Sequence, residues 1–215
     1  MRKDKLTKRI IVVAIGLLFC GIGIGLTIFA NLGVDPASVF QQGIAKVFGI
    51  SYGTASAAMN IVLISIMFFA NRKSLNIATL MAIFMIGYTA DFVSTAFKSI
   101  FFEASMLARV ILLVLGCAIM SLGVATYISP ELGVGAVDLV SETISSRTKI
   151  AYRWVRISCD VIFLVVGYFL GGNVGVGTVV VALFTGPLVQ FFRPIVYKIT
   201  GFGPEVESKK GGKND

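Results

Sequence analysis

The feature that most constrains this 215-residue chain is a series of long apolar runs that contain no charged residue. A helix rises 1.5 Å per residue, so about 20 apolar residues cross the hydrocarbon of a bilayer. Four uncharged runs reach that length, at 10–30, 52–70, 110–129 and 174–192. Each of them predicts a membrane-spanning helix.

Two further runs have the same character but contain charges. The run 75–97 holds Asp91, and the shorter run 154–170 holds Arg156 and Asp160. With both included, the sequence predicts six crossings. The composition agrees, because 56% of the residues are apolar and only 14% are charged, so lipid must cover much of the surface. The predicted fold class is therefore an all-α polytopic membrane protein.

The positions of the 19 lysine and arginine residues predict the orientation of these helices. If the N-terminus is cytoplasmic, all of them except Lys46, Lys98 and Arg109 fall in cytoplasmic segments. Both termini are then cytoplasmic. This topology accounts for the net charge of +8, so no nucleic-acid partner is expected.

The two ends of the chain lie outside the predicted helices. Residues 1–9 form a basic N-terminus, which with the next apolar run resembles a secretory signal peptide. That run is longer than the usual hydrophobic part of a signal, and we expect a retained first helix. Residues 200–215 are polar and rich in glycine, which predicts a disordered cytoplasmic tail.

The chain also contains an internal repeat. A shift of 100 residues aligns "LGV" at 32–34 with "LGV" at 132–134, and Tyr52 with Tyr152. Each repeat, 10–98 and 106–199, contains three predicted spans and one short interrupted segment. Three crossings are an odd number, so the second copy must enter the membrane from the opposite side. The sequence thus predicts two inverted-topology repeats, the arrangement of many secondary transporters. A duplication kept for stability alone is the alternative.

The interrupted segment begins with a strong helix-start signal. Asp35 can cap a helix, Pro36 fits its first position and Gly49 can end it. The predicted half-helices cover 35–48 and 135–146 and are too short to span a bilayer. Each either lies on the membrane interface as an amphipathic helix or re-enters the membrane. A re-entrant half-helix would direct its positive N-terminal end at a cavity.

Charged and polar residues inside the spans are the candidate site, because burying them in a membrane is costly. Asp160 follows Arg156 by four residues, so the two can pair on one helix face. The repeat aligns Ser38 with Asp138, which would leave an acid among polar groups, able to bind a cation or carry a proton. A purely structural ion pair is the alternative for Arg156 and Asp160. The candidate ligand- or ion-binding residues are Asp138, Asp160, Arg156, Asn60, Ser38, Asp35, Gly33, Gly133, Asp91 and Gln190.

The repeat also relates the other polar candidates. Asn60 corresponds to Asp160, and Asp91 corresponds to Gln190. An inverted repeat would bring the first pair close to a pseudo-twofold axis, where midplane sites of transporters are found. Asp91 has an alternative explanation, since it can simply approach the outer interface.

Three segments resemble a known family. These are "LGVDPASVF", "GNVGVGTVVVALFTGPLVQFF" and the Arg-x-x-x-Asp of "VRISCD". They resemble the YczE/YyaS/YitT family of bacterial integral membrane proteins, closest to its YczE branch, over roughly 10–195. The resemblance implies a multi-pass protein of the bacterial cytoplasmic membrane. It implies no substrate or mechanism.

The predicted function is a small transporter or channel for a small solute or ion, with its site between the repeats near the midplane. The expected partners are the lipid bilayer, the ligand and a second copy in a homodimer. Two alternatives stay open. One is an accessory or scaffold membrane protein, and the other is the substrate-capture subunit of an ATP-driven importer.

An enzyme is not expected. The chain contains no histidine, no Walker or Rossmann loop and no nucleophile beside a base. Cys20, Cys117 and Cys159 lie in separate apolar runs without metal-ligand spacing, which is typical of ordinary core cysteines. No cofactor and no metal are predicted.

Overall fold

The computed structural model describes residues 3–70, 77–100 and 105–202. Every regular element in these ranges is a helix, which confirms the predicted all-α class. The elements are α1 (Lys3–Ala30), α2 (Pro36–Phe48), α3 (Tyr52–Ala70), α4 (Ile77–Ile100), α5 (Met106–Ile128), α6 (Ala136–Thr148), α7 (Tyr152–Phe169) and α8 (Val176–Thr200).

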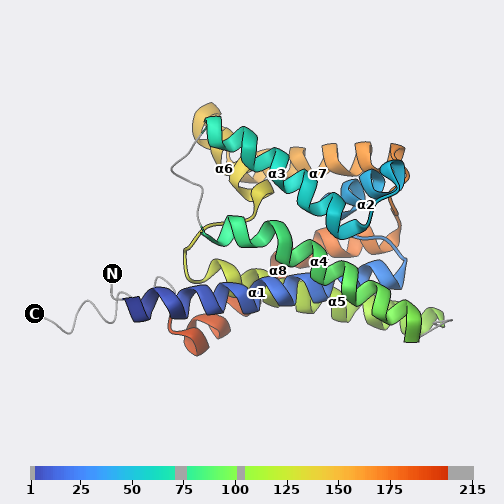
Figure 1. The fold of residues 1–215 in the computed structure, drawn as a ribbon, viewed down its shortest axis with the longest axis horizontal. Helices are drawn as coiled ribbons and strands as arrows, with labels where there is room; N and C mark the ends of the chain where they lie inside the picture. Colours follow the sequence, from blue (N-terminus) through green and yellow to red (C-terminus); the bar gives the residue numbers. More distant parts are fainter. Residues whose placement is uncertain (1–2, 71–76, 101–104, 203–215) are drawn as a thin grey trace, which may run out of the picture.

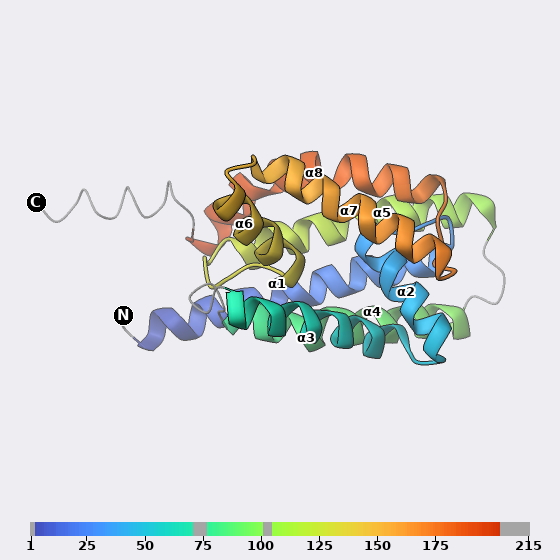
Figure 2. The same cartoon turned by 90° about the horizontal axis from the view of Figure 1, so that it is seen from above.

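The helices form two layers (Figures 1 and 2). In one layer α1 packs between α4 and α5, and α8 packs on the far side of α5. In the other layer α2 packs on α3 and α7, and α6 packs on the same two helices. The two short helices α2 and α6 lie at opposite ends of the long axis (Figures 1 and 2). Each therefore packs against α3 and α7, one near each end of these two helices.

The crossing of α1 and α5 is built on glycines. Gly16 meets Gly123, and Gly23 meets Gly116, so the two helices run antiparallel. A Cβ atom on Gly23 would lie 2.4 Å from the backbone nitrogen of Met120, closer than any real side chain allows. Small residues at these positions let the helix backbones touch, which is how membrane helices gain packing energy without a hydrophobic driving force.

The backbone repeats itself at the predicted spacing of 100 residues. Before the short helices, Asn31 and Glu131 have φ values of 53° and 56°, and Gly33 and Gly133 have 110° and 124°. After them, Gly49 and Lys149 have 64° and 61°. The two interruptions thus have the same backbone conformation, although several of their residues differ. Only at the two glycines is φ far enough from the left-handed helical region to exclude other residues.

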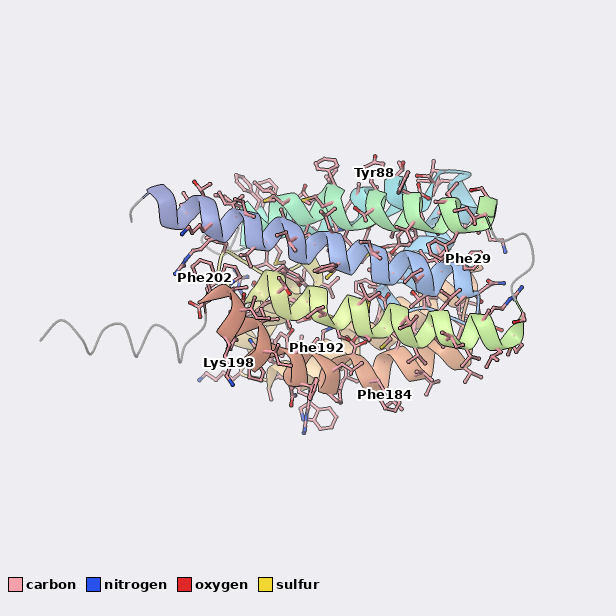
Figure 3. The ribbon with its side chains drawn as sticks, turned by 90° about the horizontal axis from the view of Figure 1, so that it is seen from below. Phe29, Tyr88, Phe184, Phe192, Lys198 and Phe202 are labelled. Carbon is pink, nitrogen blue, oxygen red and sulfur yellow. The ribbon has the colours of Figure 1, made fainter. Side chains whose placement is uncertain are left out.

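Five helices are long and apolar enough to cross a membrane: α3, α4, α5, α8 and most of α1. The sixth predicted crossing, α7, is absent from this group among the described residues, because Arg153, Arg156 and Asp160 fall in its 18 residues. The outer faces carry large apolar side chains, and Phe169 and Ile199 are 81% and 79% exposed. Tyr88 on α4 and Phe184 on α8 also point away from the bundle (Figure 3). Such surfaces are suited to lipid.

Several helix ends differ from the predicted ones. α1 begins within the predicted basic N-terminus, and α4 and α8 continue to Ile100 and Thr200, beyond the apolar runs. A helix does not stop where its apolar run stops, because its backbone hydrogen bonds continue into the interface. The predicted tail, from residue 203 on, lies outside the described residues.

Candidate functional site

Each interruption forms a backbone hydrogen bond with the opposite half of the chain. The backbone nitrogen of Gly177 in α8 donates to the carbonyl of Leu32, over 2.7 Å. The backbone nitrogen of Ala78 in α4 donates to the carbonyl of Leu132, over 3.3 Å. In both cases the free N–H groups at the start of a long helix satisfy carbonyls of a non-helical segment, which must find such partners away from water.

The two breaks also contact threonines of these same helices. The hydroxyl of Thr79 donates to the carbonyl of Val134 over 2.8 Å. A Cβ atom on Gly33 would lie 2.6 Å from Oγ1 of Thr178. The predicted site residues Gly33 and Gly133 therefore serve the backbone, through positive φ and, at Gly33, through close approach.

The first short helix starts as predicted. Asp35 is the N-cap of α2, and its Oδ2 accepts from the backbone nitrogen of Ser38 over 3.0 Å. The hydroxyl of Ser38 is buried and lies 2.9 Å from the hydroxyl of Tyr52 at the start of α3. The other carboxylate oxygen of Asp35, Oδ1, is buried and has no hydrogen-bond partner among the described residues.

The second short helix has no side-chain cap, because Gly135 stands where the first has Asp35. Its acid is Asp138 in the first turn, which accepts from the hydroxyl of Tyr152 over 2.8 Å. Arg156 on α7 also pairs with Asp138, and its Nε lies 3.2 Å from Oδ2 of Asp160. The predicted Arg156–Asp160 pair is present, and it is extended by a bridge from α7 to α6.

Corresponding positions in the two halves thus make equivalent contacts with different residues. Ser38 with Tyr52 in the first half corresponds to Asp138 with Tyr152 in the second. The first pair is neutral and buried, and the second is charged and half-exposed. At the position of Arg156 the first half has Ser56, which is buried.

The acids of the two halves are carried on helices that pack together. Asp35 caps α2, which packs on α7, and on α7 Arg156 joins Asp160 to Asp138 of α6. Among Asp35, Asp138, Asp160 and Arg156 there are three carboxylates and one guanidinium. Oδ1 of Asp160, like Oδ1 of Asp35, is buried without a hydrogen-bond partner in the described part of the chain. We call these four residues the acid cluster.

An excess of buried carboxylate is costly unless a cation or a proton neutralises it. The acid cluster can therefore hold a cation against its unpaired oxygens or carry a proton on one carboxyl. Within the described ranges, no three cysteine or acidic side chains are placed to hold a metal ion together, so a cation bound here would have fewer than three carboxylate ligands.

A pocket of about 680 Å³ is lined by residues of α1, α2, α4 and α5. Tyr52 at the start of α3 and Asp91 on α4 both line it. Asp91 is thus placed in the pocket and outside the acid cluster. The polar and charged residues that line the pocket are Asn31, Gln42, Lys46, Tyr52, Asp91, Ser94, Thr95, Lys98, Arg109 and Asn173.

Sequence reasoning did not select this pocket, although one signal pointed to it. Lys46, Lys98 and Arg109 are the three cations that the charge distribution separates from all others, and all three line it. Two predicted site residues stay apart from both sites. Asn60 is half-buried on α3 and Gln190 is exposed on α8. Their side chains form no hydrogen bond with the described residues.

Comparison with known proteins places these observations in a family. Residues 7–194 match a family of unknown function, DUF6198. An uncharacterized protein of Haemophilus influenzae is 30% identical over 89% of this chain and 86% of its own length. The uncharacterized membrane protein YczE of Bacillus subtilis is 27% identical over 83% of this chain and 82% of its own length. The uncharacterized protein YyaS of the same organism is 26% identical, over 85% and 90% of the two chains.

These matches confirm the resemblance seen in the sequence. Together with the five apolar helices, they identify a multi-pass membrane protein. No solved structure matches the chain.

Proposed function

The chain belongs to the family of unknown function DUF6198, and from its site we propose that it carries a small solute or ion across the bacterial cytoplasmic membrane. The proposed site is the acid cluster, Asp35, Asp138, Arg156 and Asp160, which lies between the two halves. The chain works there as a transporter or channel that binds a monovalent cation or a proton.

One observation carries this proposal. Oδ1 of Asp35 and Oδ1 of Asp160 come from different halves of the chain, are buried, and lack hydrogen-bond partners among the described residues. A protein that needed these acids for packing alone would satisfy both oxygens, since each unpaired buried acceptor costs about 1–3 kcal/mol. A bound cation or proton removes that cost.

The proposed architecture is a pair of inverted-topology repeats with six crossings, α7 being the sixth. Its support is the antiparallel contact of the corresponding helices α1 and α5, and the matching backbone angles of the two interruptions. The placement of α2 and α6 at opposite ends of the bundle is what two copies entering from opposite sides would produce (Figure 2). The charge distribution, with both termini cytoplasmic, adds to this support.

The short helices are proposed to re-enter the membrane. The support is that the carbonyls of Leu32 and Leu132 find backbone partners in the opposite half, as non-helical backbone inside a membrane must. α2 also packs between α3 and α7, with Ser38, Val39, Gln41 and Gly43 buried. A helix lying on the interface would need neither contact.

Access to the site is proposed to alternate between its two ends. Beside Tyr52 there is a pocket, and at the corresponding Tyr152 the bridge of Arg156 to Asp138 joins α7 to α6. In the proposed cycle this bridge closes the cytoplasmic end while the pocket end is open. Opening the second end would break the bridge and close the space around Tyr52.

Ion-dependent thermal unfolding of the purified full chain tests the proposed site. Sodium, potassium and a pH series are compared with N-methyl-D-glucamine, which is too large to enter. We expect one of the small cations or protonation to raise the unfolding temperature of the wild type. The effect should be lost in Asp35→Asn and in Asp160→Asn and kept in Glu142→Gln, an exposed acid on α6. A wild type that does not respond, or variants that respond like it, would contradict the proposal.

The two other candidates give different results. An accessory or scaffold protein would show a flat response to ions and to a broad set of metabolites. A substrate-capture subunit would co-purify with ATPase subunits, whereas a transporter of the proposed kind moves its ion in vesicles that contain this chain alone.

A further inference from the structure

The three acids of the acid cluster occupy positions that differ in how well they favour a negative charge. Asp35 caps the N-terminus of α2, and Asp138 lies in the first turn of α6. The free N–H groups at both helix starts make a negative charge favourable there. Asp160 lies in the middle of α7, whose 18 residues run from Tyr152 to Phe169. Its charge therefore lacks the support that a helix start gives to the other two.

Hydrogen bonds separate Asp138 from Asp160 in the same way. Oδ1 of Asp138 accepts from the hydroxyl of Tyr152 over 2.8 Å and also from Arg156. Oδ2 of Asp160 accepts from Nε of Arg156 over 3.2 Å, and its Oδ1 is buried with no partner among the described residues. One guanidinium thus serves two carboxylates, and Asp138 has a second donor that Asp160 lacks.

The helices packed on α7 are α2 and α6 (Figure 2), and in the described part of the chain neither places a second cation on Asp160. Lys46 on α2 lies against Gly171, beyond the end of α7. Arg147 on α6 and Arg153 on α7 are exposed. Apart from Asp160, the titratable and charged groups on these three helices and their caps are Asp35, Lys46, Asp138, Glu142, Arg147, Lys149, Tyr152, Arg153, Arg156, Cys159 and Tyr168.

A proton suits Oδ1 of Asp160 better than a metal cation does. A hard metal ion requires a shell of several oxygen ligands, and no three acidic side chains gather around one point in the described ranges. A metal ion would also share one carboxyl group with the guanidinium of Arg156, so two positive charges would lie side by side. A proton needs a single oxygen. It turns a buried charge into a neutral hydroxyl, which costs less to bury.

We propose that the ion carried by the acid cluster is a proton and that Oδ1 of Asp160 binds it. The inference rests on the proposed function and names the substrate of that site. The proton comes from water on one side of the membrane, forms an O–H bond with Oδ1, and returns to water on the other side when this bond breaks. While Asp160 is neutral, Arg156 pairs with Asp138 alone, which strengthens the bridge from α7 to α6. When Asp160 is ionised, it competes for Arg156 and weakens this bridge.

The test follows thermal unfolding of the purified full chain as the pH is lowered from about 8 to about 5. A folded state that binds a proton more tightly than the unfolded chain becomes more stable as the pH falls. We expect the unfolding temperature of the wild type to rise relative to that of Asp160→Asn over this range. Glu142→Gln, which removes an exposed acid of α6, should follow the wild type. At constant pH, sodium and potassium should act like N-methyl-D-glucamine.

Two further variants should shift this pH response in opposite directions, which general destabilisation does not do. Asp138→Asn releases Arg156 to Asp160, so half of the response should occur about one pH unit lower. Arg156→Gln removes the cation from Asp160, so half of the response should occur about one pH unit higher. Infrared spectroscopy reads the proton directly. The carbonyl band of a protonated carboxylic acid should appear in the wild type and in Glu142→Gln, and be absent from Asp160→Asn.

The outcomes separate this inference from the proposed function on which it rests. Stabilisation by sodium or potassium that is lost in Asp160→Asn would overturn the proton and leave the proposed function standing. A response to neither pH nor ions would overturn both. An infrared band that persists in Asp160→Asn would place the proton on another acid and overturn the assignment to Asp160.

Discussion

Cys20 and Met120 are in contact, with the thiol of Cys20 directed at the carbonyl of Met120 over 3.7 Å. They are separated by 100 residues, the spacing that relates the two halves of the chain, so each is the counterpart of the other. In the proposed pair of inverted repeats, two counterparts can touch only where the pseudo-twofold axis passes between them, so this contact marks the axis of the proposed architecture.

The glycine contacts beside this position should determine stability. In Gly123→Val the new Cβ would lie 2.4 Å from the backbone nitrogen of Cys20, which neither helix can avoid without separating. We expect a loss of about 2–3 kcal/mol, or roughly 5–10 °C in apparent unfolding temperature in detergent. Gly186→Ala is the control, because its Cβ would meet nothing within 4 Å. Equal stability of the two variants would argue against a close α1–α5 crossing.

Asp35 should have two separable roles. Asp35→Ala removes the cap of α2, and we expect it to cost about 1 kcal/mol of stability. Asp35→Asn keeps an oxygen that can accept from Ser38 and removes the charge, so its stability without added ions should stay close to that of the wild type. Chemical unfolding in ion-free buffer measures both. If Asp35→Asn were as unstable as Asp35→Ala, the charge itself would be needed for folding.

The corresponding contacts of the two halves should differ in strength. A double-mutant cycle of Tyr152→Phe with Asp138→Asn measures the charged pair, and one of Tyr52→Phe with Ser38→Ala measures the neutral pair. Hydrogen bonds to charged groups are worth about 1.5–3 kcal/mol and neutral ones about 0.5–1.5 kcal/mol. We expect the coupling energy to be larger for the charged pair. The reverse order would mean that the exposure of Tyr152 to solvent weakens this hydrogen bond more than the charge of Asp138 strengthens it.

Arg156 should matter for closing one end of the site. Arg156→Gln leaves Asp138 and Asp160 half-buried without their shared cation, so both stability and the ion response should change. We expect a destabilisation of about 1–2 kcal/mol, less than for a fully buried pair, because these side chains are about a third exposed and water screens them. Part of it should be recovered by adding Asp160→Asn, which removes the unpaired acid. A double variant less stable than the single one would show that Asp160 does not need Arg156.

The sequence predicted the interruptions well because their signals are local. Asp35 with Pro36 and Gly49 set the two ends of α2. The repeat places the start of α6, which has no side-chain N-cap, but α6 continues to Thr148, beyond the predicted end at 146. The Arg156–Asp160 pair was visible for the same reason, since a spacing of four residues fixes two side chains on one helix face.

The contacts that span larger separations could not be predicted in this way. The bridge from Arg156 to Asp138 depends on how α6 packs on α7, and the pocket depends on three helix ends that meet only in the fold. Asn60 and Gln190 were selected by the repeat alone. The repeat equates positions along the chain and does not determine which side of a helix faces the site.

The proposed inverted repeats are tested most directly by labelling corresponding positions and finding from which side of the membrane each one reacts. Ser51 and Ala151 are exposed, directly precede α3 and α7 and are related by the shift of 100 residues. Ser51→Cys and Ala151→Cys are made after Cys20, Cys117 and Cys159 have been replaced, and intact cells are treated with a membrane-impermeant maleimide. Two inverted repeats predict labelling of Ser51→Cys from outside and of Ala151→Cys only after the cells are opened. Labelling of both positions from the same side would contradict the inverted arrangement and the site proposed between its halves.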